Sequence, residues 1–159
     1  QEVIHQSKYL KIINDSKSTT LSSTVPFLES NEKIYWILGG LFKKGDKFNL
    51  NKKYFKNLEA YIYGKDRQVF YKLFKNKIKV NLSKDLRNTL KLIPNLKDIR
   101  TKVTVLFSPS AASFDQYKNF EERGRQFNML IKRYLPIEWI NILIHFMIGG
   151  KTSIKQFFW

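Results

Sequence analysis

The chain has 159 residues, a net charge of +16 and no cysteine. Its length suits one domain with its own core, and a content of 43% hydrophobic and 15% aromatic residues excludes an intrinsically disordered chain. Without cysteine there are no disulfides and no thiolate chemistry, which is compatible with a reducing compartment. We expect no signal peptide, because the first residues lack a basic region followed by a clean apolar stretch.

The positive charge raises the question of a polyanionic partner. The chain has 29 Lys and Arg against 13 Asp and Glu, but the lysines are scattered singly or in pairs and long basic blocks are missing. A solvated, Lys-rich surface accounts for this pattern, so we expect no nucleic-acid partner. A basic nucleic-acid-binding module is the alternative, and it predicts binding that falls steeply as salt rises.

The chain begins with two short extended runs, at residues 3–5 and 9–13, which are expected to form a hairpin at a sheet edge. The loop "NDSKSTT" follows. Thr19 or Thr20 is then expected to cap a helix that contains Pro26, so that this helix starts late or kinks.

Strand-like and helix-like runs alternate through the rest of the chain. Strands are expected at residues 33–40, 60–64, 77–80 and 102–107, and helices at 51–58, 66–74, 83–93 and 119–134. Ser83 is expected to cap the helix that follows it, and Asn119 with Glu122 forms a pair similar to a capping box. The alternation predicts an α/β fold with a mainly parallel sheet and helices on its faces.

In such sheets, ligands bind beyond the C-terminal ends of the strands. The candidate loops therefore follow Ile13, Leu38, Tyr63 and Phe107.

The last residues differ from the rest. Pro136 is expected to end the preceding helix, and residues 137–148 are strongly apolar although they include Glu138 and His145. This run is shorter than the ~20 residues of an ordinary membrane span. A helix docked on the domain is the first interpretation and an interfacial helix the second, so membrane contact of the tail is not expected.

The loop after the first strand of the main sheet carries three candidate side chains. Asp15 can accept hydrogen bonds from sugar hydroxyls, Lys17 can neutralise phosphate or carboxylate, and Thr19 can present a hydroxyl near a helix start to an anion. The same residue types also suit a loop that only satisfies backbone donors.

The loop "GGLFKKGDKF" places Lys43 and Lys44 where a strand ends, and either lysine can meet an anion. It is no phosphate loop, because the pattern G-x-x-x-x-G-K-[ST] is absent; "GGKTS" near the C-terminus lacks the first glycine of that pattern.

The stretch "SPSAASFDQYKNFEERG" offers the hydroxyls of Ser108, Ser110 and Ser113. A serine nucleophile is not supported, since there is no G-x-S-x-G elbow. His5 and His145 lie in strand-like and apolar contexts and are interpreted as structural, and no cluster of metal ligands is visible.

Three motifs, "INDSKSTT", "LGGLFKKGDKF" and "LFSPSAASFDQYKNFEERGRQF", occur in this order. Together they resemble the C-terminal domain of the Mur ligase family, and the long third motif is most similar to the member that adds D-glutamate. The resemblance covers residues 1–135 and implies a Rossmann-like domain that binds the incoming amino acid. Residues 136–159 have no counterpart in the family pattern and form an apolar tail of unknown role.

The resemblance implies a step of peptidoglycan biosynthesis in the cytoplasm, a process that supports cell wall biogenesis, cell shape and cell division. ATP, with Mg²⁺, phosphorylates the carboxylate of UDP-N-acetylmuramoyl-L-alanine, and the amine of D-glutamate then attacks the acyl phosphate. The family holds the UDP group, ATP and Mg²⁺ mainly on two other domains. We therefore expect a fragment that is inactive alone, or an inactive remnant of a ligase.

The resemblance also implies roles for individual residues. Asp15 would face the nucleotide ribose, and Lys17 would lie near the phosphates and the reaction centre as the catalytic lysine. One carboxylate of D-glutamate would be held by Thr19 and Lys43, with Lys44 as the alternative to Lys43. The other carboxylate would be held by Ser113, Phe114 and the backbone of Phe120.

Overall fold

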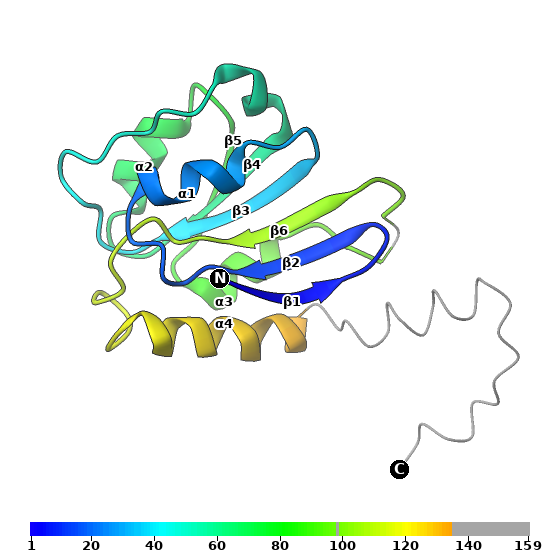
Figure 1. The fold of residues 1–159 in the computed structure, drawn as a ribbon. Helices are drawn as coiled ribbons and strands as arrows, with labels where there is room; N and C mark the ends of the chain where they lie inside the picture. The colour runs from blue at the N-terminus through cyan, green and yellow to red at the C-terminus, as the bar shows by residue number, and fades with distance from the viewer. Residues whose placement is uncertain (98, 135–159) are drawn as a thin grey trace, which may run out of the picture.

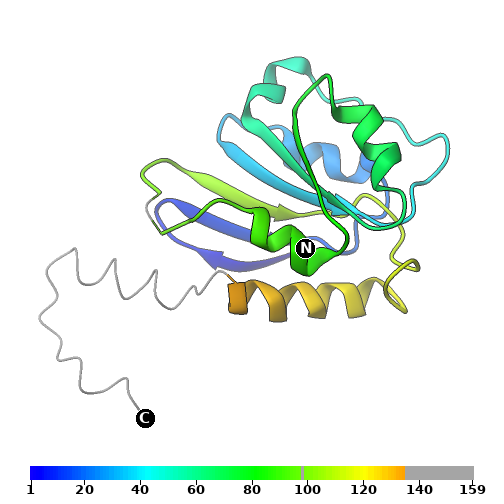
Figure 2. The same cartoon turned by 180° about the vertical axis from the view of Figure 1, so that it is seen from behind.

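The computed structural model describes residues 1–97 and 99–134, which form one sheet with helices on both faces (Figures 1 and 2). Along the chain the elements are β1 Glu2–Gln6, β2 Leu10–Asn14, α1 Leu21–Leu28, β3 Lys33–Gly39, the 3₁₀ helix η1 Lys52–Asn57, β4 Leu58–Tyr63, α2 Arg67–Phe74, β5 Lys79–Leu82, α3 Leu86–Leu92, β6 Val103–Phe107 and α4 Phe120–Tyr134.

The six strands lie in the order β1-β2-β6-β3-β4-β5. β1 is antiparallel to β2 at one edge, and all other neighbouring strands are parallel. The expected hairpin and the mainly parallel sheet are therefore confirmed. Because β6 lies between β2 and β3, the loops that follow these three strands meet at the same edge of the sheet.

The side chains of each strand alternate between two apolar cores. Trp36 and Leu38 of β3 face the core that α1 and α2 cover, whereas Ile37 faces the core under α3 and α4. Figure 1 shows α1 and α2 above the sheet and α3 and α4 below it. Phe107 of β6 stacks on Phe127 of α4, with ring centroids 4.3 Å apart, which fixes α4 beneath β6.

α1 begins after Thr20, whose side chain accepts a hydrogen bond from the Ser23 N–H. The expected cap is thus Thr20 rather than Thr19. Pro26 lies inside α1, which nevertheless starts at Leu21, so the proline does not delay the helix.

β4 starts at Leu58 rather than at residue 60, and local hydrogen bonds explain two further predictions that were wrong. Asp85, not Ser83, caps α3, since the Asp85 side chain accepts from the Asn88 N–H. β5 starts at Lys79 rather than at residue 77, because the N–H groups of Lys77 and Ile78 both bond to the Phe74 carbonyl, 2.8 and 3.1 Å away, at the end of α2.

A buried carboxylate lies near the start of β4, far from the loops at the other end of the strands. Glu59 is 5% exposed and accepts hydrogen bonds from Tyr61 (2.8 Å) and Asn81 (3.1 Å). Lys79 and Lys33 place ammonium groups 2.8 and 3.4 Å from its oxygens. Burial alone would raise the pKa of Glu59, but the hydrogen bonds from Lys79, Tyr61 and Asn81 and the charge of Lys79 lower it to about 2.

Among the residues that the structure describes, no helix has the length and apolar character needed to cross a membrane. The predicted tail, residues 136–159, lies outside the described residues, as does the end of the predicted domain at residue 135.

Candidate functional site

The loops after β2, β3 and β6 are joined by backbone hydrogen bonds at the C-terminal edge of the sheet. The Asp15 N–H bonds to the Phe107 carbonyl at 2.7 Å, and the Ser110 N–H bonds to the Ser18 carbonyl at 3.0 Å. The Gly39 N–H bonds to the Pro109 carbonyl at 2.9 Å. Three segments that are distant in sequence therefore form one continuous surface, as expected for a ligand site in a parallel sheet.

The glycine pair that ends β3 permits this close approach. A Cβ on Gly39 would lie 2.1 Å from the Tyr63 carbonyl oxygen, and one on Gly40 would lie 2.3 Å from the Ala112 carbonyl oxygen. Both residues also have positive φ, 143° and 129°. Their role is steric: they let the β3, β4 and β6 loops pack directly on one another.

A buried arginine holds the loops from behind. Arg123 of α4 is fully buried, and its guanidinium donates to the Ser16 hydroxyl (3.1 Å), the Ser16 carbonyl (2.8 Å) and the Ala111 carbonyl (2.8 Å). Burial lowers the pKa of Arg123. The β2 loop and the β6 loop are thus fixed to one side chain.

Sequence reasoning missed Arg123. The available signal was its position on the buried face of α4, four residues before Phe127, where a cation has no place unless it is hydrogen-bonded. Gly124 belongs to the same contact, because a Cβ there would lie 3.2 Å from the Ser16 Cβ.

Asp15 is engaged in a buried network of hydroxyl groups. Its Oδ2 accepts from the Ser108 hydroxyl at 2.8 Å, and Thr24 lies within hydrogen-bonding distance of Ser108 (2.7 Å), Ser110 (2.6 Å) and Ser18 (2.7 Å). Burial raises the pKa of the Asp15 carboxyl, and the bond from Ser108 partly opposes this. Asp15 is 7% exposed.

The residues expected to hold D-glutamate lie on the three joined loops but differ in exposure. Thr19 and Lys43 are exposed, as the alternative Lys44 also is, whereas Ser113 is buried. Phe114 is 71% exposed.

The start of α4 keeps free donors. The Asn119 side chain accepts from the Glu122 N–H at 2.8 Å, and the Glu122 carboxylate accepts from the Lys118 N–H at 2.6 Å. The pair is therefore similar to the expected capping box, with its return bond shifted by one residue. Within the described residues, the N–H groups of Phe120 and Glu121 carry no hydrogen bond, so they are available to an anion.

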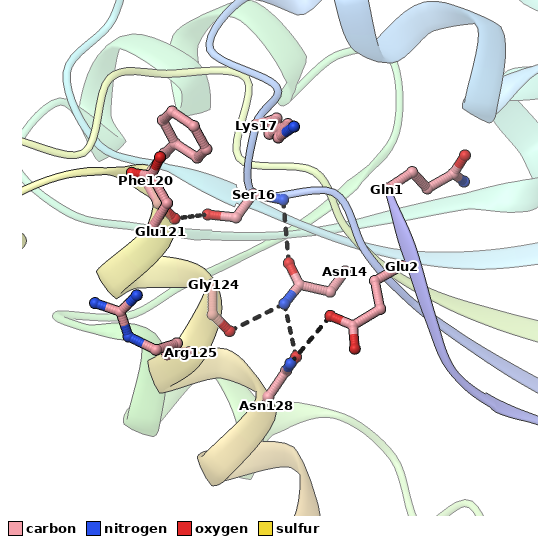
Figure 3. A pocket seen from close by; sticks show the side chains of 10 residues that line it. All are labelled: Gln1, Glu2, Asn14, Ser16, Lys17, Phe120, Glu121, Gly124, Arg125 and Asn128. Carbon is pink, nitrogen blue, oxygen red and sulfur yellow. Dashed lines mark hydrogen bonds between the residues drawn. The ribbon is translucent and has the colours of Figure 1, made fainter.

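An open pocket of about 380 Å³ lies between the start of β1, the end of β2 and α4. Figure 3 shows Asn14 in this pocket, donating to the Gly124 carbonyl (2.9 Å) and to Asn128 (2.6 Å). Of the predicted site residues, Lys17 and Phe120 line it. The remaining predicted residues lie outside its lining, so the pocket adjoins only part of the predicted site.

In the part of the chain that the structure describes, no three His, Cys, Asp or Glu side chains are grouped to share a metal ion. His5 lies in the edge strand β1, where burial lowers its pKa. The described residues therefore provide no grouped set of carboxylate ligands for Mg²⁺.

Known proteins were compared with the chain. The UDP-N-acetylmuramoylalanine–D-glutamate ligase of Rickettsia felis is 33% identical over 142 residues, which are 84% of this chain and 32% of that protein. The ligases of the same name from Wolbachia pipientis and Agrobacterium fabrum are 35% identical over 127 residues and 34% identical over 140 residues. No family model matches the chain.

This chain spans about a quarter to a third of the length of these relatives, since the matches cover 32%, 25% and 29% of them. The observed fold is the one expected for the C-terminal domain of a Mur ligase. The chain is therefore similar, over 79–87% of its own length, to part of the UDP-N-acetylmuramoylalanine–D-glutamate ligases.

Proposed function

We propose that this chain is the amino-acid-binding domain of an ATP-dependent ligase that joins D-glutamate to UDP-N-acetylmuramoyl-L-alanine, a step of peptidoglycan biosynthesis in the cytoplasm. The observation that carries the proposal is the convergence of the β2, β3 and β6 loops, which brings all three predicted binding motifs to one edge of the sheet. The names of the relatives supply the reaction.

D-Glutamate has two carboxylates, so its site needs two anion-binding positions. We assign the first position to the Thr19 hydroxyl and the Lys43 ammonium, both of which are exposed to an incoming ligand. The second position uses Ser113, the backbone of Phe114 and the N–H of Phe120. The free N–H groups at the start of α4 support this second assignment, because a helix N-terminus attracts a carboxylate.

The domain would contribute to the reaction mainly by positioning. The amine of the bound D-glutamate attacks the carbonyl carbon of the acyl phosphate, an amide bond forms, and the bond to the phosphate oxygen breaks. The proton released by the amine goes to a base or to solvent. Orienting the amine at the carbonyl removes much of the entropic barrier of a bimolecular step.

Lys17 and Asp15 are proposed to face the nucleotide and the reaction centre. Lys17 is exposed and can neutralise charge on a phosphate group there. Asp15 has one oxygen bonded to Ser108, while Oδ1 carries no hydrogen bond from the described residues and can accept one from a ribose hydroxyl.

ATP and Mg²⁺ are proposed to bind mainly to other parts of the ligase. The described residues include neither a phosphate loop nor a group of carboxylates suited to Mg²⁺. When bound, they would activate the carboxylate of UDP-N-acetylmuramoyl-L-alanine by phosphorylation.

Titration of the isotopically labelled 159-residue chain with D-glutamate, followed by NMR, tests the binding assignment. We expect saturable shifts of the amide signals of Thr19, Ser113 and Phe120. L-Glutamate should bind more weakly, since its amine and carboxylates cannot all reach the same groups. Equal shifts with both enantiomers, or none with D-glutamate, would contradict the proposal.

The adjacent lysines offer a matched pair of variants. Lys43→Ala should weaken D-glutamate binding roughly tenfold, the effect of losing one charged hydrogen bond, and Lys44→Ala should leave it nearly unchanged. The reverse result would assign the ligand to Lys44. If neither substitution changes D-glutamate binding, the segment that contains Lys43 and Lys44 is not part of the site.

The reaction itself can be tested in a chimera of the Rickettsia felis ligase whose matching region is replaced by this chain. We expect ADP release that depends on both D-glutamate and UDP-N-acetylmuramoyl-L-alanine. A folded chimera that binds D-glutamate but forms no amide bond would identify the domain as an inactive remnant.

A further inference from the structure

The segment from Leu41 to Asp46 is attached at both of its ends to the other loops of the site. At its start, Leu41 and Ala112 exchange backbone hydrogen bonds of 2.9 and 3.1 Å, which form an isolated antiparallel bridge. At its end, the Asp46 carboxylate accepts a hydrogen bond from the Leu21 N–H at the start of α1. Lys43 lies between these two attachments.

Asp46 is attached to α1 at a residue whose position is fixed by the core. Leu21 is the first residue of α1, and its side chain is fully buried in the core. An N–H in the first turn of a helix has no partner within the helix, and Thr20 already accepts from Ser23. Asp46 therefore satisfies a donor that α1 itself leaves free, and its charge favours that position.

Lys43 is coupled to Asp46 by a tight turn. The Asp46 N–H donates to the Lys43 carbonyl at 3.0 Å, and Gly45 between them has a φ of +81°. Asp46 thus bonds to Lys43 through its backbone and to α1 through its side chain. Thr19 lies two residues before Leu21, so the single residue Asp46 links the segments of the two residues assigned to the first carboxylate of D-glutamate.

We propose that Asp46 is a positioning residue that sets the spacing between Lys43, Thr19 and the Ser113 loop, and thereby selects an amino acid with the chain length of glutamate. This inference rests on the proposed function. A lysine ammonium is a point charge on a flexible stem, so its backbone must be held if it is to discriminate between chain lengths. The bridge at Ala112 fixes Lys43 relative to Ser113, and Asp46 fixes it relative to Thr19.

A purely structural role of Asp46, as a cap of α1, makes a different prediction. Its loss would lower the stability of the helix without changing which dicarboxylate is preferred. Two variants separate these roles. Asp46→Ala removes the acceptor, whereas Asp46→Asn keeps a side-chain oxygen that can accept from Leu21.

The experiment measures binding of D-glutamate and D-aspartate to the 159-residue chain and to both variants by NMR titration, with hydrogen exchange of the Leu21 amide and the melting temperature recorded alongside. For Asp46→Ala we expect faster exchange at Leu21 and D-glutamate binding weakened roughly three- to tenfold, because ordering the Lys43 segment on binding then costs up to the free energy of the lost Asp46–Leu21 hydrogen bond. D-Aspartate binding should change by less, so the preference for glutamate falls. Asp46→Asn should stay within about twofold of the original chain.

Two outcomes would overturn the inference. Asp46→Ala could bind D-glutamate as well as the original chain does, or it could lose both ligands equally in proportion to a fall in melting temperature. If the original chain gives no saturable response to D-glutamate, the proposed function fails and the selectivity role fails with it. The exchange rate of Leu21 still distinguishes that case, because it reports the hydrogen bond independently of any ligand.

Discussion

Two charged side chains are buried at opposite ends of this sheet, and they are stabilised in different ways. Glu59, near the start of β4, has two lysine ammonium groups within 3.4 Å and accepts hydrogen bonds from Tyr61 and Asn81. Arg123, beneath the loops, has no carboxylate within salt-bridge distance among the described residues and bonds to Ser16 and Ala111.

The difference follows from what each end of the sheet does. At the Glu59 end the strands are regular, so the geometry there is already fixed by the sheet. The carboxylate paired with two lysines only adds stability. At the Arg123 end the chain leaves the sheet, and the buried carbonyls of Ser16 and Ala111 need a donor. A guanidinium meets this need because its donors are arranged in a rigid fork. The buried charge at that end therefore determines loop geometry.

Replacing Arg123 should have the largest effect. Arg123→Met leaves the carbonyls of Ser16 and Ala111 without their donor, and we expect a loss of about 3–5 kcal/mol in the free energy of unfolding. Chemical denaturation measures this loss. Arg125→Met, which changes an exposed arginine of the same helix, is the matched control and should be nearly neutral. Equal effects of the two substitutions would contradict the role of Arg123.

The glycine contacts test the loop end of the sheet by another route. Gly39→Ala places a Cβ against the Tyr63 carbonyl, and we expect a loss of about 2–4 kcal/mol in the free energy of unfolding. Gly45→Ala is a useful comparison, since Gly45 also has positive φ but a Cβ added there would meet no atom within 4 Å. We expect a smaller loss for Gly45→Ala, and this loss measures the cost of placing alanine at positive φ without a steric contact. A loss at Gly45 as large as that at Gly39 would show that steric contact is unimportant.

The contribution of Glu59 to the free energy of unfolding should depend on pH. The pKa of Glu59 is about 2 in the folded protein, below its ordinary value of 4.5, so its contribution is present above pH 4.5 and is lost as the pH falls toward 2. Glu59→Gln should therefore lower the free energy of unfolding by about 2 kcal/mol at neutral pH. Denaturation curves at several pH values should show this difference shrinking in acid. A difference that is independent of pH would exclude the charge as its cause.

The smallest expected effect concerns the corrected cap of α3. Asp85→Ala removes the acceptor for the Asn88 N–H and should cost about 1 kcal/mol in the free energy of unfolding. Ser83→Ala keeps that cap, but it removes a hydroxyl that donates to the Asp85 carbonyl and lies 2.5 Å from the Thr89 hydroxyl. Its effect should be smaller. The opposite ranking of the two variants would restore Ser83 as the cap.

Much of the fold was predictable because the spacing of apolar residues and the residues that form turns are local properties of the sequence. Alternating apolar runs identified the strands, and the order of strands and helices implied a mainly parallel sheet. Boundaries failed where a hydrogen bond outside the pattern decided them. β5 begins late because Lys77 and Ile78 still bond to the end of α2, which no property of "KIKV" reveals.

The site was predictable in its parts but not in how they are held together. The three motifs identified the loops that the structure joins at one edge of the sheet, and their roles in binding D-glutamate stay predictions. The side chains of Arg123, Asp46 and Glu59 act through partners at least twenty residues away in sequence, except for the contacts of Glu59 with Tyr61 and of Arg123 with Ala111. Their importance depends on the tertiary structure, and a single sequence does not encode those contacts as a pattern.

The hydroxyl network around Thr24 has a direction. Because Ser108 donates its one proton to the Asp15 carboxylate, Thr24 is the donor in its contact with Ser108. The hydroxyls of Ser18 and Ser110 can then donate to the Thr24 oxygen, although each also faces a backbone carbonyl, that of Thr20 at 3.4 Å and that of Ser108 at 3.1 Å. The ionised carboxylate thus polarises a relay of hydroxyls that runs from the β6 loop through α1 to the β2 loop. Protonation of Asp15 would let this relay reverse while every heavy atom stays in place.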